Sequence, residues 1–204
     1  MQIETYVAPP FDTNCYLVTC EKTGESIGVD AGKGFYDFVM QRGRPLKKVV
    51  LTHSHFDHIF DAHKFTEAGI PIALHRQDSE NLRRPGADGL SLLMQPVPTS
   101  AFEMLKPNVD DYVGTSRFYA LETPGHSPGS VSYFFPEEKI LFSGDTLFKG
   151  TCGRTDFPGS DPGAMRSSLK KLMELEDEVL VYPGHFEPTT IKDEKKWVLP
   201  GGMP

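Results

Sequence analysis

The stretch LTHSHFDHIF, residues 51–60, places three histidines and an aspartate within six positions: His53, His55, Asp57 and His58. Its first two residues are the end of the apolar run KKVVLT (47–52), and this run predicts a short buried strand. Loops that follow buried strands commonly present functional side chains. Imidazole nitrogens and a carboxylate oxygen suit zinc, iron or manganese, so the stretch predicts a metal site. A lone H-x-H also fits a solvated polar turn, but four ligand-type residues beside a buried strand favour the metal site.

Bulk properties narrow the class of protein. The 204 residues suffice for one domain, expected over 1–204, and no apolar run reaches the ~20 residues that span a bilayer. A net charge of −7 disfavours nucleic acid and anionic membranes as partners. The N-terminus does not resemble a signal peptide. Cys15, Cys20 and Cys152 fit neither a zinc finger nor a paired disulfide set, so we expect free thiols in the cytoplasm. The oligomeric state is not readable from these features.

Periodicity and turn residues predict the order of the elements. Four segments read as helices, at 34–43, 57–69, 160–177 and 189–198. Nine read as strands, at 2–7, 14–20, 26–30, 47–52, 70–75, 116–124, 129–136, 139–145 and 178–184. Between 83 and 116, Pro, Gly, Asp and Ser interrupt every apolar cluster and predict a long irregular loop, which we expect to shape substrate selectivity. The order suggests two similar halves with a sheet-on-sheet core flanked by helices.

Three more polar residues share the context of the first cluster. His126 lies in a Pro-Gly turn between strands, Asp145 follows an apolar strand and a glycine, and His185 follows an apolar strand and Pro-Gly. Glycine permits close backbone approach at each position. Singly, Asp145 fits a helix cap and either histidine fits a surface position. Together with the first cluster, five of the seven histidines lie at turns.

These motifs resemble the metallo-β-lactamase-fold hydrolases, whose T-H-x-H-x-D-H appears as THSHFDH, followed by G-H, G-D and G-H in the same order. The resemblance spans essentially the whole chain. It implies an α+β fold, an αββα four-layer sandwich of two mixed sheets flanked by helices. It implies that two metal ions, most simply zinc with iron or manganese as alternatives, are held by seven residues: His53, His55 and His126 on one, Asp57, His58 and His185 on the other, and Asp145 between them. It also implies catalytic roles for Asp57 and Asp145.

Such a centre favours hydrolysis. Two cations about 3.5–4 Å apart acidify a shared water, and one polarises a carbonyl. A thiolate leaving group needs the least assistance, because thiols ionise near neutral pH. The chemistry therefore points to a small-molecule thioester, with a lactone or ester as alternatives.

The segment GDTLFKGTCGRTDFPG (144–159) resembles glyoxalase II-like thioesterases, in which a basic residue follows Cys-Gly. Arg154 holds that position and is predicted to bind a substrate carboxylate such as that of glutathione. An internal ion pair with Asp156 is the alternative. Cys152 is expected to pack rather than to act as a nucleophile.

The chain departs from glyoxalase II at several positions and resembles its short bacterial-type members. Glu187 replaces a tyrosine two residues after the last histidine, where it would either repel an anionic substrate or cap the final helix. Phe60 replaces a glycine and would either narrow the entrance or pack in the core. These differences weaken the assignment of glutathione, but they leave the ligand set complete.

Two other functions compete with hydrolysis. Persulfide dioxygenases share the segment CGRTDF and use a single iron, held at positions that match His53, His126 and Asp145. Ligand type alone does not separate iron from zinc. A module that only binds metal is the third possibility, disfavoured because no ligand is missing.

Overall fold

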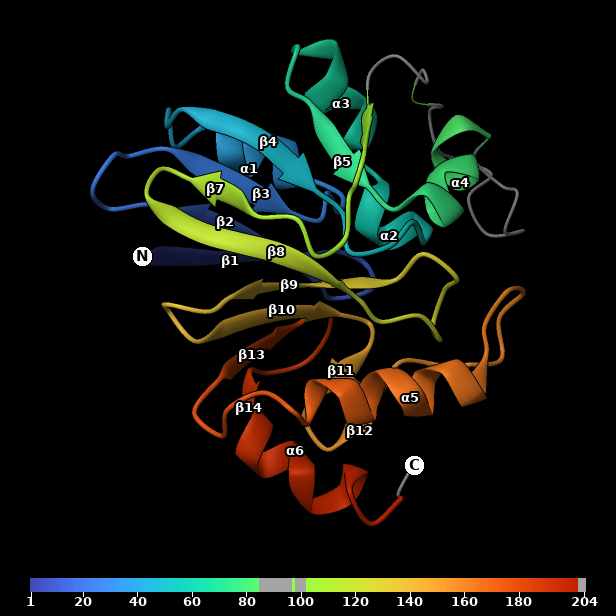
Figure 1. Ribbon diagram of the computed structural model, residues 1–204. Coiled ribbons are helices and arrows are strands. Elements are labelled where there is room, and N and C mark those ends of the chain that lie inside the picture. The colour runs from blue at the N-terminus through green and yellow to red at the C-terminus, as the bar shows by residue number, and fades with distance from the viewer. Residues whose placement is uncertain (85–96, 98–101, 202–204) are drawn as a thin grey trace.

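The computed structural model describes residues 1–84, 97 and 102–201, and its strands form two large sheets (Figure 1). Neighbours β1 to β3 of the first sheet pair antiparallel and β3 to β6 pair parallel, so the sheet is mixed. Its strands, in spatial order, are β1 (Gln2–Ala8), β2 (Thr13–Thr19), β3 (Ser26–Val29), β4 (Leu46–Val50), β5 (Ile72–Leu74) and β6 (Phe102–Met104).

The second sheet is also mixed, because β10 and β13 are parallel while its other neighbours are antiparallel. Its strands, in spatial order, are β14 (Thr189–Thr190), β13 (Leu180–Pro183), β10 (Ile140–Gly144), β9 (Val131–Phe135), β8 (Ser116–Glu122) and β7 (Asp111–Val113). A separate hairpin follows β10 and consists of β11 (Leu147–Phe148) and β12 (Thr151–Cys152).

Helices cover the outer faces of both sheets (Figure 1). Those of the first half are α1 (Phe35–Met40), α2 (Phe56–Ile59), α3 (Ala62–Glu67) and α4 (Ser79–Arg83), with a 3-10 turn at Arg76–Asp78. Those of the second half are α5 (Pro162–Leu172) and α6 (Ile191–Val198). None of the helices in the described ranges has the length and apolarity needed to cross a membrane.

Three apolar clusters separate the layers. The central one packs Tyr16 and Ile27 of the first sheet against Tyr133 and Phe142 of the second. An outer cluster joins the first sheet to its helices, and another joins the second sheet to α5 and α6. Two sheets face to face, each with helices outside, confirm the predicted αββα sandwich.

The segment predicted as one helix over 57–69 is two helices, α2 and α3, which break at Asp61. The buried carboxylate of Asp61 accepts hydrogen bonds from the backbone N–H groups of Gly34 and Tyr36 at the start of α1. Ile59 and Phe65 still lie on the buried side, as the spacing predicted. The tertiary contact of Asp61 therefore overrides local helical propensity.

The prediction of an irregular loop over 83–116 is wrong at two places. Residues 102–104 form β6 and residues 111–113 form β7, each at the edge of a sheet. Three residues are too few to show the alternation that identifies a strand. Residues 85–96 and 98–101 lie outside the described part of the chain.

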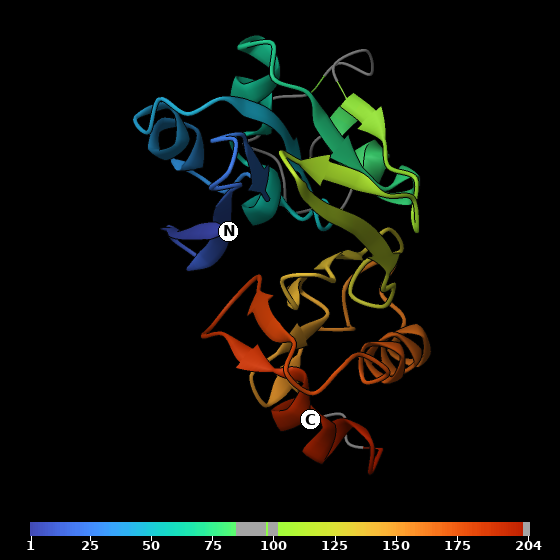
Figure 2. The same ribbon diagram turned by 60° about the vertical axis from the view of Figure 1, so that its left-hand side comes forward.

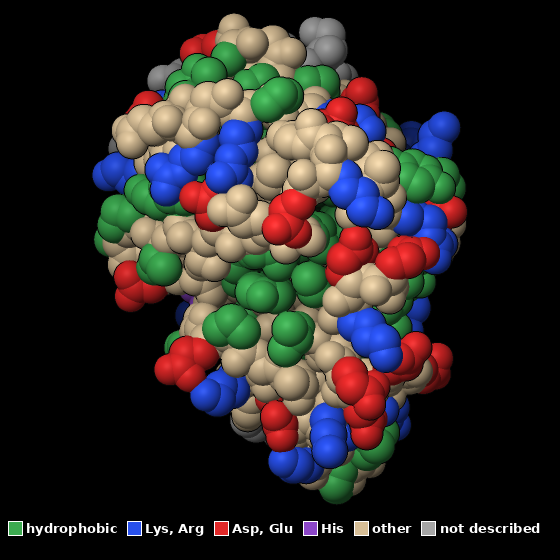
Figure 3. Space-filling model, turned by 90° about the vertical axis from the view of Figure 1, so that its left-hand side faces the viewer, with side chains coloured by type: hydrophobic (Ala, Val, Ile, Leu, Met, Phe, Trp, Pro, Cys, Tyr) green, Lys and Arg blue, Asp and Glu red, His purple; other side chains and the backbone are tan. Residues whose placement is uncertain are grey.

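The face on the left of Figure 1 gathers hydrophobic side chains at mid-height, between regions of mixed charge (Figure 3). Acidic and basic side chains are interspersed over the described part of this face. Nucleic acid recognition instead uses basic residues clustered on one side.

Candidate metal centre

The seven predicted ligands occupy loops at the carboxyl ends of β4, β8, β10 and β13. Strands β8, β10 and β13 run in one direction, so their carboxyl ends share one edge of the second sheet. The residues are His53 and His55 after β4, Asp57 and His58 in α2, His126 between β8 and β9, Asp145 after β10, and His185 after β13.

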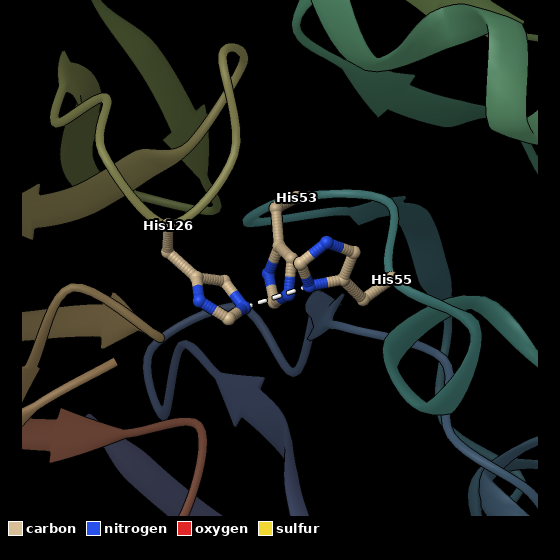
Figure 4. Close-up of side chains that lie close together, drawn as sticks. All are labelled: His53, His55 and His126. Carbon is tan, nitrogen blue, oxygen red and sulfur yellow. Dashed lines mark hydrogen bonds between the residues drawn. The ribbon is translucent and has the colours of Figure 1, made fainter. Parts of the chain in front are cut away.

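One ligand group consists of His53, His55 and His126, whose candidate ligand atoms lie within 4.8 Å of one another (Figure 4). All three side chains are buried. His55 Nδ1 faces His126 Nε2 at 2.7 Å. Three ring nitrogens that point at one place from two loops make a typical nitrogen site for a divalent metal.

The second group consists of Asp57, His58 and His185, again with ligand atoms within 4.8 Å of one another. His185 Nε2 lies 3.3 Å from Asp57 Oδ2, and His58 Nε2 lies 3.5 Å from the same oxygen. A carboxylate with two imidazoles is a second suitable ligand set.

Asp145 lies between the two groups. Its Oδ2 is 3.4 Å from His126 Nε2 and 3.5 Å from His185 Nε2, one histidine from each group. Its Oδ1 is 3.3 Å from His58 Nε2. The structure thus brings all seven predicted residues together, with Asp145 at the position expected of a bridge.

Unsatisfied polar atoms test whether metals fit this site. His53 Nε2, His58 Nε2 and Asp145 Oδ1 are buried and have no hydrogen-bond partner among the described residues. His58 Nε2 and Asp145 Oδ1 approach each other without hydrogen-bond alignment. Buried polar groups left unpaired are costly, and a cation at either group would satisfy these atoms. The donor set therefore fits divalent metals.

A second layer of contacts orients the ligands. His58 Nδ1 lies 2.9 Å from Asp30 Oδ2, and the same carboxylate accepts from the N–H and hydroxyl of Thr52. The Thr13 hydroxyl donates to Asp57 Oδ2 at 2.7 Å. Such partners fix the tautomer of a ligating histidine and the position of a ligating carboxylate.

His126 is oriented by backbone. Its Nδ1 lies 2.8 Å from the carbonyl oxygen of Arg154, which can only accept, so Nδ1 carries the proton and Nε2 presents a lone pair inward. Asp78, which is also buried, accepts from Ser54 N–H, the Ser127 hydroxyl and Gly129 N–H. Asp78 thereby ties the loop of His53 and His55 to the loop of His126.

The charges of the site also favour cations. Burial, together with the neighbouring ring of His58, holds the pKa of His53 well below its usual value. Burial and then His126 lower the pKa of His55 to about 4. These rings are neutral at pH 7, as ligands must be.

His58 behaves in the opposite way. Burial alone would lower its pKa, but the carboxylates of Asp57 and Asp145, together with that of Asp30, hold it well above the usual value. Burial would likewise raise the pKa of Asp57 and of Asp145, yet His58 holds both below the ordinary range. Buried carboxylates without a bound cation therefore draw a proton onto His58, and a metal would take over that role.

Replacing Asp30 by asparagine tests this second layer. Asp30 has a left-handed backbone (φ 62°), which asparagine tolerates, so the change mainly removes charge. We expect metal affinity to fall about 10- to 100-fold. The measurement is zinc titration against a competing chelator, with Asp37→Asn as an exposed control. An unchanged affinity would show that Asp30 does not support the site.

Sequence reasoning missed Asp30 and Asp78. Asp30 carried the same signal as Asp145, an acidic residue at the end of an apolar strand. Asp78 follows β5 in a polar segment, and the sequence gives no sign that it reaches the loop of His126.

Arg154 forms the ion pair with Asp156 that was the alternative to substrate binding. Its guanidinium donates to both carboxylate oxygens of Asp156 at 2.9 and 2.8 Å, and both side chains are exposed. Substrate binding by Arg154 stays a prediction. Cys152 packs against the cluster beneath the second sheet, and burial raises the pKa of its thiol, in keeping with a packing role.

Glu187 does not cap the last helix, because Thr190 accepts the hydrogen bond from Asp193 N–H there. Glu187 instead lines a pocket that includes His185. Phe60 is half-buried, with the ammonium of Lys33 over its ring at 5.6 Å, so it is not a core residue.

Among curated proteins, the chain is 30% identical to the hydroxyacylglutathione hydrolase GloC of Haemophilus influenzae, over 96% of each chain. It is 34% identical to a hydroxyacylglutathione hydrolase of Bartonella quintana, over 91% of this chain and 67% of that one.

Several solved structures are also similar to this chain. BLEG-1 B3 metallo-beta-lactamase matches with a TM-score of 0.85 and 32% identity, over 96% of this chain and 97% of that one. The di-iron-bound form of TTHA1623 matches with a TM-score of 0.81 and 34% identity, over 95% of this chain and 97% of that one. ETHE1 from Myxococcus xanthus matches with a TM-score of 0.77 and 27% identity, over 96% of this chain and 82% of that one. Residues 8–185 match the family model of the Metallo-beta-lactamase superfamily. The chain belongs to the metallo-beta-lactamase superfamily.

Proposed function

We propose that this protein is a metal-dependent thioester hydrolase of the glyoxalase II type, which cleaves S-2-hydroxyacylglutathione to glutathione and a 2-hydroxy acid. The observation that carries the proposal is the convergence of two ligand groups on Asp145, with buried ring nitrogens left unpaired between them. When bound, a pair of divalent cations supplies Lewis acidity and an acidified water at neutral pH. Zinc is our expectation, with iron or manganese as alternatives.

The chain itself prepares this centre in two ways. His53 and His55 stay neutral, because burial and neighbouring rings lower their pKa values. The Arg154 carbonyl accepts from His126 Nδ1, so that Nε2 faces the other candidate ligands. Preorganised ligands of this kind lower the cost of arranging charge during the reaction.

The relatives support the choice of a thioester. Two of them are named hydroxyacylglutathione hydrolases, and one covers nearly the full length of this chain. Arg154 is retained as a candidate contact for a substrate carboxylate. The three cysteines are free of disulfides, which suits the reducing cytoplasm that we expected.

The test is hydrolysis of S-D-lactoylglutathione and a panel of short thioesters by zinc-, iron- and manganese-loaded protein. Release of free thiol with turnover that a chelator abolishes is the expected result. If no thioester is cleaved while lactones, esters or phosphodiesters are, the substrate class is wrong.

A persulfide dioxygenase-like iron oxidoreductase is the second candidate. The positions that the resemblance assigns to a single iron, His53, His126 and Asp145, lie in the same centre, and His126 Nε2 is 3.4 Å from Asp145 Oδ2. The similarity to a di-iron-bound structure also favours iron as a possible metal. Oxygen consumption on addition of glutathione persulfide to the iron-loaded protein would favour this function over hydrolysis.

A further inference from the structure

A pocket opens beside His185, at the rim of the metal centre. Its lining comes from the turn between β1 and β2, the turn of the β11–β12 hairpin and the loop after β13. Figure 2 shows the blue N-terminal strands above the orange-red C-terminal strands of the second sheet. The lining residues are Phe11, Asp12, Lys149, His185, Phe186 and Glu187. Because His185 belongs both to this lining and to the second ligand group, a substrate bound at the metal centre would lie next to the pocket.

Lys149 is the basic residue of this lining. Its ammonium lies 2.6 Å from Glu187 Oε2, and the two side chains are 57% and 76% exposed. Ion pairs between two solvated, flexible side chains contribute little to stability and are screened by salt. A carboxylate brought in by a ligand can therefore take the place of Glu187 at little cost.

Arg154 differs from Lys149 in both geometry and position. It donates two parallel hydrogen bonds to Asp156, and its guanidinium also lies 4.4 Å from the ring centroid of Phe157. A bidentate, stacked pair is harder to displace than a single ammonium contact. Arg154 is also absent from the lining of the pocket beside His185.

The rest of the lining consists of two aromatic rings, Phe11 and Phe186, together with Asp12 and His185. Phe11 and Phe186 are 52% and 67% exposed, which is unusual for rings of this size. Phe11 packs edge-on against Phe56, and Phe186 has a left-handed backbone (φ 67°). The buried Asn14 amide donates to Phe186 O at 2.8 Å and holds the backbone of this loop in place. The pocket therefore offers the ammonium of Lys149 beside two aromatic rings, and Asp12 is the second carboxylate of its lining besides Glu187.

We propose that Lys149 binds the carboxylate of the thiol portion of the substrate by displacing Glu187, and that this exchange selects anionic thioesters. The inference rests on the proposed hydrolase function and names a specificity residue for it. Glu187 holds the place of the substrate carboxylate in the free protein, so it weakens binding of anions without blocking it.

The experiment compares two substrates that share one acyl group. S-D-lactoylglutathione carries carboxylates on its thiol, and the lactoyl thioester of N-acetylcysteamine does not. Lys149→Met is expected to lower kcat/KM about five- to tenfold for the glutathione ester alone, and Glu187→Gln to raise it about threefold. Lys139→Met is the matched control, since Lys139 forms an exposed ion pair with Glu176 just before β10, whereas the metal centre lies after the other end of that strand.

Binding gives a second readout that does not require turnover. Calorimetric titration with S-methylglutathione should show weaker binding to Lys149→Met and tighter binding to Glu187→Gln. Equal effects on both thioesters would overturn the inference, and so would loss of discrimination with Arg154→Met instead of Lys149→Met. If no thioester is cleaved, the proposed function fails, and the titration still decides whether Lys149 binds the anion.

Discussion

Asparagine in place of Asp145 is expected to lower kcat/KM for thioester hydrolysis on the order of a thousandfold, beyond the 10- to 100-fold typical of residues around the ligands. Bound metal should fall from two ions per chain to at most one. Asp145 approaches His126, His185 and His58 within 3.5 Å, so both ligand groups depend on it. Asparagine keeps the shape and removes the charge, so the loss would report the charge of the bridge.

Steady-state kinetics and elemental analysis of the same preparation measure this effect. Asp177→Asn is the control, because Asp177 is an exposed partner of Lys195 at 2.6 Å, away from the centre. An Asp145→Asn protein that keeps both ions and full activity would show that the charge of Asp145 is not needed for metal binding or for hydrolysis.

Alanine at Gly184 is expected to cut activity more than about a hundredfold, as misplacements near 1 Å do, without changing any ligand. A Cβ at this position would lie 2.2 Å from Asp145 Oδ1 and 2.8 Å from His58 Cε1. Both contacts are far below van der Waals separation, so the two ligands must move. The backbone of Gly184 is not left-handed, so alanine strains the ligands rather than the chain.

The measurement is the rate of thioester hydrolysis and the metal content of the same preparation, together with thermal unfolding of the metal-free protein. Gly43→Ala is the comparison: its Cβ meets nothing within 4 Å, and its left-handed backbone (φ 60°) makes the change a purely local strain. Gly184→Ala should lose metal while Gly43→Ala keeps it. Equal metal content in the two variants would show that the centre tolerates a Cβ at Gly184.

Much of the fold followed from periodicity. A helix was predicted over 160–177 because Met165, Leu169 and Leu172 recur on one side, and the structure has it at Pro162–Leu172 with all three buried. The break at Asp61 was not predictable, because it depends on N–H groups of α1 about 25 residues away. Strands β6 and β7 were missed because short edge strands are defined by pairing with neighbours rather than by pattern.

The candidate ligands could be proposed from sequence because four of them form one cluster after an apolar strand, and His126, Asp145 and His185 lie at turns next to strands. The residues that surround the candidate ligands were harder to predict from sequence. Asp78 acts through three hydrogen bonds to loops distant in sequence, and Lys149 gains its significance only from the pocket that it shares with His185. Such roles depend on which loops meet, and no local pattern encodes that.

The most direct test of the metal centre is a crystal structure of metal-loaded protein with anomalous scattering recorded at the metal edge. We expect two peaks, one among His53, His55 and His126 and one among Asp57, His58 and His185, with the carboxylate of Asp145 between them. A structure with no peak at either place, or with metal bound only elsewhere on the chain, would contradict it.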